Sequence, residues 1–308
     1  MGNIILVIVC LALGVLARRS GRFPEATPTV LARLVVDVAL PAMTLLFVPR
    51  IAIDGSEGLA TVVAAVTAPW LIFALAVALL WPLARARGWS RGTLGALVLT
   101  AGLGNTAFVG FPLIEALYGT DGLRTAIVFD QAGSFLVLST AGLVYAAASA
   151  GRERPSLAVL ARRLASSPPF LAFVLALFLH GVVFPSALVV VLEKLAALVV
   201  PLALISVGYQ LRVDRSVLAR DGAKVAAGLA VRLVLTPLAI LLALRVAGLH
   251  GEPADVIVAE SAMGPMVMGA VLAVEENLDP SLATLMVGIG VPLSLVTVPI
   301  WAWLMGLG

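Results

Sequence analysis

Charged residues are absent from four long, apolar stretches of this chain. The stretches run from Gly58 to Ala84, from Gly92 to Ile114, from Leu164 to Leu192 and from Pro280 to the C-terminus. Each is longer than the roughly 20 apolar residues that cross a bilayer as an α-helix. The pattern predicts an all-α polytopic membrane protein.

Shorter charge-poor segments between these stretches bring the expected number of transmembrane helices to ten. The expected spans cover residues 3–18, 26–48, 58–84, 92–117, 122–149, 165–184, 187–210, 217–247, 254–275 and 280–304. The composition agrees, because 61% of the residues are hydrophobic and 12% are charged, where a soluble protein carries about 25% charged residues. We expect residues 156–164, ahead of the sixth span, to lie along the membrane interface.

Composition also excludes several classes of function. One cysteine rules out an internal disulfide framework, and two distant histidines give no metal site. The arginines lie in short loops between apolar spans, which argues against nucleic acid as a partner. An intramembrane enzyme would need a catalytic constellation such as paired aspartates or a metal-binding histidine motif, and neither appears. No cofactor is expected.

The distribution of lysine and arginine predicts the orientation in the cell (inner) membrane. Connections after spans 1, 3, 5 and 7 hold most of the 20 Lys and Arg, whereas the opposite connections hold Arg50, Arg124 and Arg245. Short loops rich in these residues stay in the cytoplasm. Both termini are therefore expected outside. The first span has no basic region before it and is interpreted as a retained helix rather than a signal peptide.

An internal repeat divides the chain into residues 1–150 and 151–308. A shift of 160 residues sets Pro41 on Pro201 and the segment 98–105 on 258–265, and a shift of 159 extends the match through spans 5 and 10. Five spans per copy is an odd number, so the second copy enters the membrane inverted, as in many secondary transporters. We expect Pro41 and Pro201 to break their helices.

Spans 4 and 9 are the interrupted helices of the two copies. Span 4 is broken at Gly102, Gly104 and Asn105, with Thr106 and Pro112 following, and span 9 is broken at Gly264, Pro265 and Met266. Glycine and proline weaken helices, while asparagine favours the N-cap and proline the first position of a new helix. The alternative is a pair of tolerated kinks, since both residues are common in membrane helices.

Two restarted helices would bring their N-termini together near the middle of the membrane. Free backbone N–H groups and the positive end of a helix dipole bind anions without a basic side chain. We therefore expect a small organic anion, such as a carboxylate, to bind at residues Gly104, Asn105, Thr106, Gly264, Pro265 and Met266.

These segments resemble the auxin efflux carrier family, which includes plant auxin exporters and bacterial carboxylate permeases. Residues 104–113, GNTAFVGFPL, are similar to the family's Asn-Thr-x-x-x-Gly-x-Pro-Leu stretch, and Leu40-Pro41-Ala42 and Gly264-Pro265 add support. The resemblance covers nearly the whole chain. Gly104 departs from the plant exporters, which commonly have proline there, and no long hydrophilic loop separates spans 5 and 6.

The resemblance implies a ten-helix fold with crossing spans 4 and 9, similar to bile-acid symporters and cation/proton antiporters. Spans 1, 2, 6 and 7 would form a scaffold, and spans 3–5 and 8–10 would carry the substrate in an elevator-like movement. The scaffold would join two copies as a homodimer surrounded by membrane lipid.

Ionisable residues inside the spans often mark ion pathways. Asp130 and Gln131 lie about 13 Å into span 5, and Glu260 precedes the break in span 9. Each acid is a candidate for proton or Na⁺ coupling. Asp130 is alternatively a structural acid, and Glu260 is alternatively the partner of Arg232.

The leading hypothesis is a secondary active transporter of a small organic anion. The alternative is a sodium- or proton-coupled symporter or antiporter on a similar fold, although such an antiporter would place an acid at the crossing itself. A passive channel also fits small residues along a pore. No ATP-binding loop appears, so pumping would draw on an ion gradient.

Overall fold

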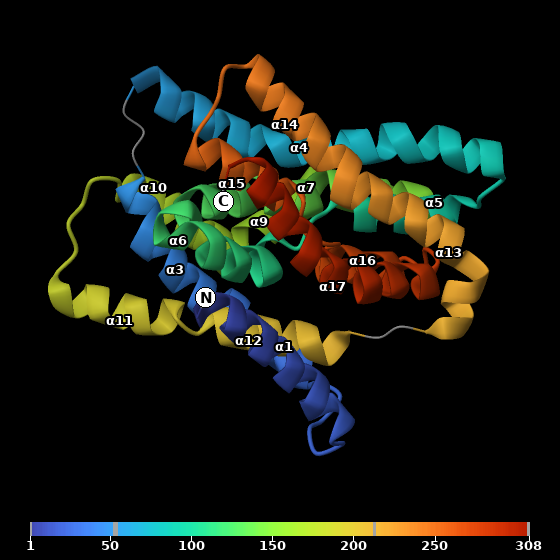
Figure 1. The fold of residues 1–308 in the computed structure, drawn as a ribbon, viewed down its shortest axis with the longest axis horizontal. Coiled ribbons are helices and arrows are strands. Elements are labelled where there is room, and N and C mark those ends of the chain that lie inside the picture. Colours follow the sequence, from blue (N-terminus) through green and yellow to red (C-terminus); the bar gives the residue numbers. More distant parts are fainter. Residues whose placement is uncertain (1, 52–54, 212–213, 307–308) are drawn as a thin grey trace.

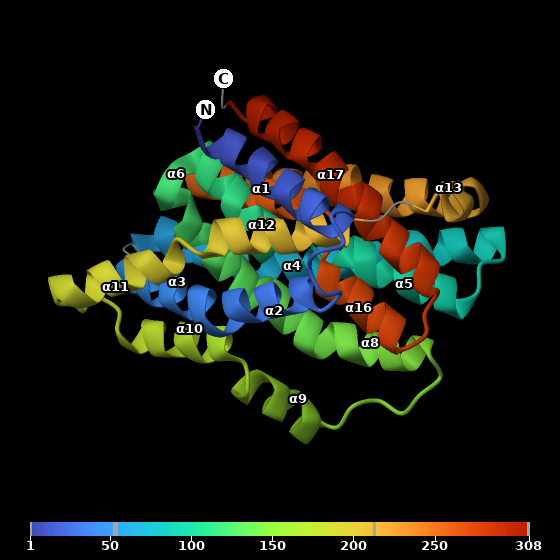
Figure 2. The same cartoon turned by 90° about the horizontal axis from the view of Figure 1, so that it is seen from below.

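The computed structural model describes residues 2–51, 55–211 and 214–306, and this part of the chain is helical without a strand. Figure 1 shows the helices from one side and Figure 2 shows them turned by 90°. The α-helices are α1 (Gly2–Arg19), α2 (Thr27–Leu34), α3 (Leu40–Phe47), α4 (Gly55–Arg87), α5 (Arg91–Gly102), α6 (Phe111–Val128), α7 (Phe135–Val137), α8 (Leu143–Ser149), α9 (Leu157–Ala165), α10 (Pro168–Phe178), α11 (Ser186–Ala196), α12 (Val199–Gln210), α13 (Arg215–Ala230), α14 (Thr236–Val246), α15 (Glu252–Ser261), α16 (Val267–Glu275) and α17 (Pro280–Leu304).

Short π-helical turns join several of these helices into longer ones. They are η1 (Val35–Ala39), η3 (Thr106–Gly110), η4 (Phe129–Ser134), η5 (Leu138–Gly142) and η6 (Val231–Leu235), and a 3₁₀ turn, η2 (Val48–Arg50), ends the second span. Single π-turns inside α-helices often occur at functional sites. Here η3, η4 and η6 all contribute to the site described below.

Six helical stretches of the described chain are long and apolar enough to cross a membrane. They are Thr27–Arg50, Gly58–Arg87, Thr106–Ser149, Ser186–Gln210, Arg215–Val246 and Pro280–Leu304. A seventh would be the pair α9 and α10, which meet at a bend of 73°. Large apolar side chains face outward on these helices, for example Val63 at 52% and Leu242 at 57% exposure. A surface of this kind suits a multi-pass membrane protein.

The breaks explain why fewer long helices are present than the ten expected spans. α5 has 12 residues, α15 has 10 and α16 has 9, so none crosses a bilayer alone. Thr106–Ser149 is one helical stretch of 44 residues, but Gly119 has non-helical angles (φ 70°, ψ −166°) at the place where spans 4 and 5 were expected to separate. Length and composition alone therefore leave the ten-span arrangement as a proposal.

The end of the sixth span and the helices at two prolines differ from the sequence-based expectation. The sixth span was expected to reach residue 184, but α10 ends at Phe178, and a turn and an extended segment with Pro185 follow. Pro41 was expected to break its helix, but the π-turn η1 ends just before α3 and absorbs the proline, so the helix continues. Pro201 lies in the first turn of α12, where its missing N–H costs nothing. The interruption there falls between α11 and α12.

The helices pack as two groups. α1, α2, α3, α10, α11 and α12 contact mainly one another, and α4, α5 and α13 to α17 contact mainly one another. α1 and α12 approach closely because glycine replaces a side chain at both surfaces: a Cβ on Gly14 would overlap the carbonyl of Ile205, and one on Gly208 would overlap that of Leu11. α6 and η3 lie between the groups, contacting α1 and α12 on one side and α15 on the other.

Candidate functional site

The two broken segments cross and pair through their backbones. α5 ends at Gly102, and Leu103 is extended (φ −116°, ψ 121°). Gly104 and Pro265 then form an isolated antiparallel bridge. The N–H of Asn105 donates to the carbonyl of Gly264 at 2.8 Å, and the N–H of Met266 donates to the carbonyl of Leu103 at 2.9 Å. These bonds supply partners to buried backbone groups that the helices cannot provide.

Glycine at the crossing allows this close approach. A Cβ on Gly104 would overlap the guanidinium of Arg232, and a Cβ on Gly264 would lie 2.8 Å from the carbonyl oxygen of Gly290. Gly290 in turn leaves room for the ring of Pro265. A Cβ atom essentially never lies closer than 3 Å to another heavy atom, so a side chain at any of these three positions would clash. Gly290 was not predicted from the sequence. The signal that could have identified it is the pair of glycines within three residues of α17.

Two helices begin again beside the crossing, and their N-terminal ends lie next to it. After the first break, the earliest backbone bonds run from Val109 and Gly110 to the carbonyl of Asn105. After the second, the N–H of Ala270 donates to the carbonyl of Met266. The preceding N–H groups in each first turn have no carbonyl one turn earlier in their own helix. The expected pair of half-helix N-termini is therefore present at the crossing.

Two details of the restart differ from the expectation. The side chain of Asn105 makes no capping hydrogen bond, and its Nδ2 is buried without a partner. Pro265 is not the first residue of the second half-helix, because α16 begins at Val267 with Met266 as its N-cap. The residues that would otherwise cap the two half-helices form the extended backbone bridge instead.

Asp130 is buried and held by two side chains. It lies in η4 with 4% exposure. The hydroxyl of Thr106 donates to Oδ1 at 2.5 Å, and Nε2 of Gln131 donates to Oδ2 at 2.6 Å. Asp130 thus contacts the first residue of the restarted helix η3. Both of its oxygens have partners, whereas Oε1 of Gln131 has none.

Glu260 and Arg232 are also buried at the crossing, at 0% and 1% exposure. Nε of Arg232 donates to the carbonyl of Met263 at 2.6 Å, and Nη2 lies 3.4 Å from the backbone carbonyl of Glu260. The guanidinium therefore caps the C-terminal end of α15, where the helix dipole is negative. The alternative that Glu260 is the partner of Arg232 holds only as a charge interaction, because neither carboxylate oxygen has a hydrogen-bond partner and the two side chains form no direct ion pair.

The carboxylate of Glu260 instead faces Gly110. A Cβ at Gly110 would lie 2.6 Å from Oε2 and 2.8 Å from Oε1 of Glu260. In the sequence Gly110 stands out only as part of the stretch 104–113, and its contact with Glu260 was missed because it depends on the packing of α15 against α6.

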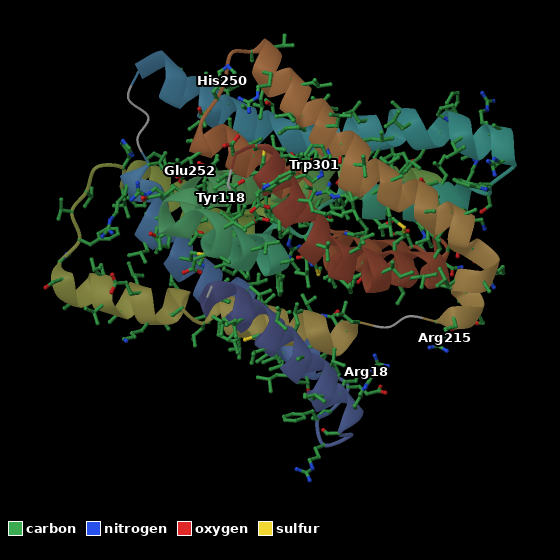
Figure 3. All side chains as sticks on the ribbon, in the orientation of Figure 1. Arg18, Tyr118, Arg215, His250, Glu252 and Trp301 are labelled. Carbon is green, nitrogen blue, oxygen red and sulfur yellow. The ribbon has the colours of Figure 1, made fainter. Side chains whose placement is uncertain are left out.

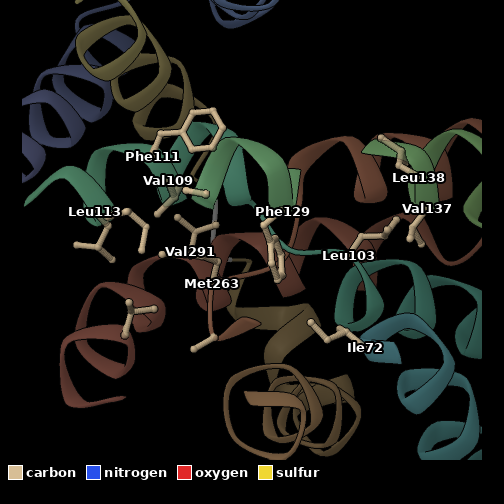
Figure 4. Packing of buried hydrophobic residues seen from close by; sticks show 14 of the residues in the cluster. Ile72, Leu103, Val109, Phe111, Leu113, Phe129, Val137, Leu138, Met263 and Val291 are labelled. Carbon is tan, nitrogen blue, oxygen red and sulfur yellow. The ribbon is translucent and has the colours of Figure 1, made fainter. Parts of the chain in front are cut away.

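The structure thus brings most of the predicted site residues into one place. The crossing contains Gly104, Asn105, Thr106, Gly264, Pro265 and Met266, with Asp130 and Gln131 linked through Thr106, and with Glu260 linked through Gly110. Gly102 ends α5, as expected. Pro112 was also expected to break its helix, but it is the second residue of α6, and the helix continues through it from the π-turn η3. Pro41 and Pro201 lie in the other helix group. Apolar side chains surround the crossing, including Val109, Phe129, Met263 and Val291 (Figure 4).

A cavity of about 500 Å³ lies between α4, α6 and the start of α15. Polar and charged residues line it, including Arg124, His250 and Glu252, the last two labelled in Figure 3. It extends to Val128, two residues before Asp130.

The comparison with known proteins gives the family of this chain. The family described as "Membrane transport protein" matches residues 1–302. The chain belongs to this family of auxin efflux carrier-like membrane transporters.

Two archaeal proteins resemble this member of the family. An uncharacterized transporter of Methanothermobacter thermautotrophicus is 28% identical over 303 residues, which cover 97% of this chain and 96% of that protein. One of Methanocaldococcus jannaschii is 27% identical over 217 residues, which cover 69% and 68%. The family and these relatives indicate transport across a membrane.

Proposed function

We propose that this family member is a secondary active transporter of a small organic anion, such as a carboxylate or an auxin-like acid, bound where the two broken helices cross. The observation that carries the proposal is the meeting of two half-helix N-termini at a buried backbone bridge between Gly104 and Pro265. Nδ2 of Asn105 lies beside that bridge, buried and without a partner.

The chemistry of the crossing suits a carboxylate. Backbone N–H groups and helix dipoles at the starts of η3 and α16 supply fixed positive ends in a dry environment. A buried amide N–H without a partner costs about 1–3 kcal/mol, so a carboxylate oxygen that accepts from Asn105 Nδ2 recovers this energy. Thr106 gives its hydroxyl hydrogen to Asp130, and its backbone N–H remains for the anion.

The mechanism we propose is an elevator-like movement of ten spans in two inverted repeats, residues 1–150 and 151–308. The packing supports the separation of a scaffold from a moving group, because α1 to α3 and α10 to α12 form one group of contacts and α4, α5 and α13 to α17 form another. The first group would be the scaffold, which also joins two copies as a homodimer. An even number of spans keeps both termini on one side, the outside of the cell membrane by the arginine distribution.

The buried acids would couple the anion to an ion gradient. The candidates for H⁺ or Na⁺ coupling are Asp130, with Gln131, and Glu260. Each acid contacts a residue of η3 directly: Asp130 contacts Thr106, and Glu260 contacts Gly110.

An antiporter or symporter of the cation-coupled type is the second candidate function. The observation that favours it is the pair of buried acids, Asp130 and Glu260, which interact electrostatically across the site. A cation exchanger needs such acids, but it does not need the unpartnered amide of Asn105.

Transport assays in liposomes distinguish the two functions. We would measure uptake of labelled mono- and dicarboxylates while imposing pH, Na⁺ and voltage gradients singly. Asn105→Ala removes the amide but keeps both backbone bonds of the crossing, so it should fold and lose saturable uptake. Asn277→Gly is the matched control, because Asn277 lies in a loop at φ 56°, which glycine adopts freely. Proton or Na⁺ exchange without carboxylate uptake would refute the anion carrier and favour the antiporter.

A further inference from the structure

We propose that Glu260 is an internal carboxylate that competes with the transported anion for the N-terminal end of η3, and that a proton on Glu260 is what admits the anion. The inference rests on the proposed anion site and assigns the coupling ion and the coupling residue within it.

The position of the carboxylate carries the argument. Glu260 is fully buried, and its two oxygens lie against Gly110, the last residue of η3, whose N–H donates to the carbonyl of Asn105. A half-helix N-terminus attracts negative charge. An ionised Glu260 therefore places a negative charge close to the N-terminal end that the substrate carboxylate requires.

Hydrogen bonding separates the two buried acids. Asp130 receives hydrogen bonds at both oxygens, from Thr106 and Gln131, and these bonds stabilise its ionised form. Glu260 receives none. A buried carboxylate without donors is far less stable than the neutral acid. Of the two acids, Glu260 is the one that the structure leaves to be neutralised by a proton.

Two charged groups face Glu260 from the helices around α15, namely Asp130 on η4 and Arg232 on η6. Farther along, Arg245 of α14 and Asp255 of α15 approach each other at 3.9 Å, and α17 carries no charged residue. With both acids ionised, the cluster has an excess of negative charge. With Glu260 protonated, Arg232 balances Asp130, and an incoming anion meets the helix N-termini without an opposing carboxylate.

The same arrangement disfavours a metal cation as the coupling ion. Arg232 is buried at the same site and its positive charge acts on the Glu260 carboxylate, so a Na⁺ bound there would be opposed by a fixed positive charge. The described residues contain no group of three His, Cys, Asp or Glu side chains that could surround a metal ion. A proton needs one oxygen of Glu260 and no further ligands.

The proposed transport step accounts for every proton and charge that moves. A proton from water on the open side binds one oxygen of Glu260, the anion binds beside it, and both are released on the other side. A monocarboxylate and its proton cross together without net charge. Transport is then driven by the pH gradient and is insensitive to Na⁺.

The protonation of Glu260 can be measured without substrate. Infrared difference spectra of the purified protein, titrated from acidic to alkaline pH, report the carbonyl stretch of protonated carboxylic acids. We expect a band of the protonated acid that Glu260→Gln removes and that both Asp130→Asn and Glu193→Gln leave. Glu193 is an exposed acid on α11 and serves as the matched control. A band removed by Asp130→Asn and kept in Glu260→Gln would overturn the assignment.

Binding then tests the competition. With indole-3-acetate and malonate as probes, affinity for the wild-type protein should fall about tenfold per pH unit once Glu260 ionises, as linkage to one proton requires, and Glu260→Gln should bind equally at every pH. Affinity that follows Na⁺ instead of pH, or that keeps its pH dependence in Glu260→Gln, would overturn the proposal. If neither probe binds while the infrared assignment holds, the anion function fails and the protonation of Glu260 stands.

Discussion

Gly104→Ala tests the close packing of the crossing against Arg232. The added Cβ would overlap Nη2 of Arg232 and lie 2.7 Å from Cζ. The backbone at Gly104 does not need positive φ, so alanine adopts it without strain. The guanidinium must therefore shift and give up its hydrogen bond to the carbonyl of Met263, which is 2.6 Å long.

The magnitude follows from that lost bond. A hydrogen bond to a charged group contributes about 1.5–3 kcal/mol, and a buried carbonyl left without a partner costs a comparable amount. Alanine recovers about 0.4–1 kcal/mol by restricting the unfolded chain. We expect a net loss of about 3 kcal/mol in the free energy of unfolding. For a chain of this size the midpoint temperature would fall by about 5 °C.

The single cysteine provides the assay. Cys10 is buried in α1 at 4% exposure, so a thiol-reactive dye labels it only when α1 separates from its neighbours. The dye signal against temperature gives the unfolding midpoint in detergent. Gly222→Ala is the control, because the nearest atom to its Cβ is 3.9 Å away in the helix α13. That change should leave the midpoint unchanged or raise it slightly, because alanine in a helix interior adds about 0.5–1 kcal/mol to the free energy of unfolding. Equal midpoints for the two variants would refute the account of the crossing.

Three further changes test other parts of the structure. Gly14→Leu should drive α1 away from the backbone of α12 and allow Cys10 to be labelled at room temperature; slow labelling like wild type would contradict this packing. Gly110→Ala should displace the flexible carboxylate of Glu260, costing about 1–2 kcal/mol of stability but abolishing pH-dependent uptake in liposomes, and uptake with an unaltered pH profile would argue against the role of this contact. Hydrogen bonds from the Ser216 side chain and from the backbone of Val217 and Ser216 hold the pKa of Asp214 below its ordinary value, so this cap of α13 should persist at neutral pH and be lost only as the pH falls through that lowered value. Asp214→Ala should therefore speed hydrogen exchange of the first turn at neutral pH, with the difference from wild type shrinking below that value, and equal exchange at neutral pH would exclude the cap.

The positions of both helix breaks could be predicted because they depend on local chemistry. Gly102 and Gly104 weaken one helix and Pro265 removes a donor from the other, whatever surrounds them. That the breaks lie side by side followed only from the repeat, since neither segment alone specifies its partner.

The contacts of the charged groups could not be predicted. Arg232 and Glu260 have opposite charges and lie in neighbouring spans, so an ion pair was the natural expectation. The structure instead directs the guanidinium to the carbonyls at the end of α15, because those carbonyls have no partner within their own helix. The carboxylate then faces Gly110, a contact set by how two helices pack and not by either sequence.

The backbone bridge also has a consequence for biosynthesis. The two segments that it joins come from opposite halves of the chain, so translation delivers Leu103 and Asn105 to the membrane long before Gly264 and Met266. Asp130 finds Thr106 and Gln131 within the first half, and Arg232 finds Met263 within the second. Each nascent half can therefore insert with its charge already solvated by its own residues. The proposed anion site is assembled last, when the halves meet, and a truncated chain released early by the ribosome has no complete site.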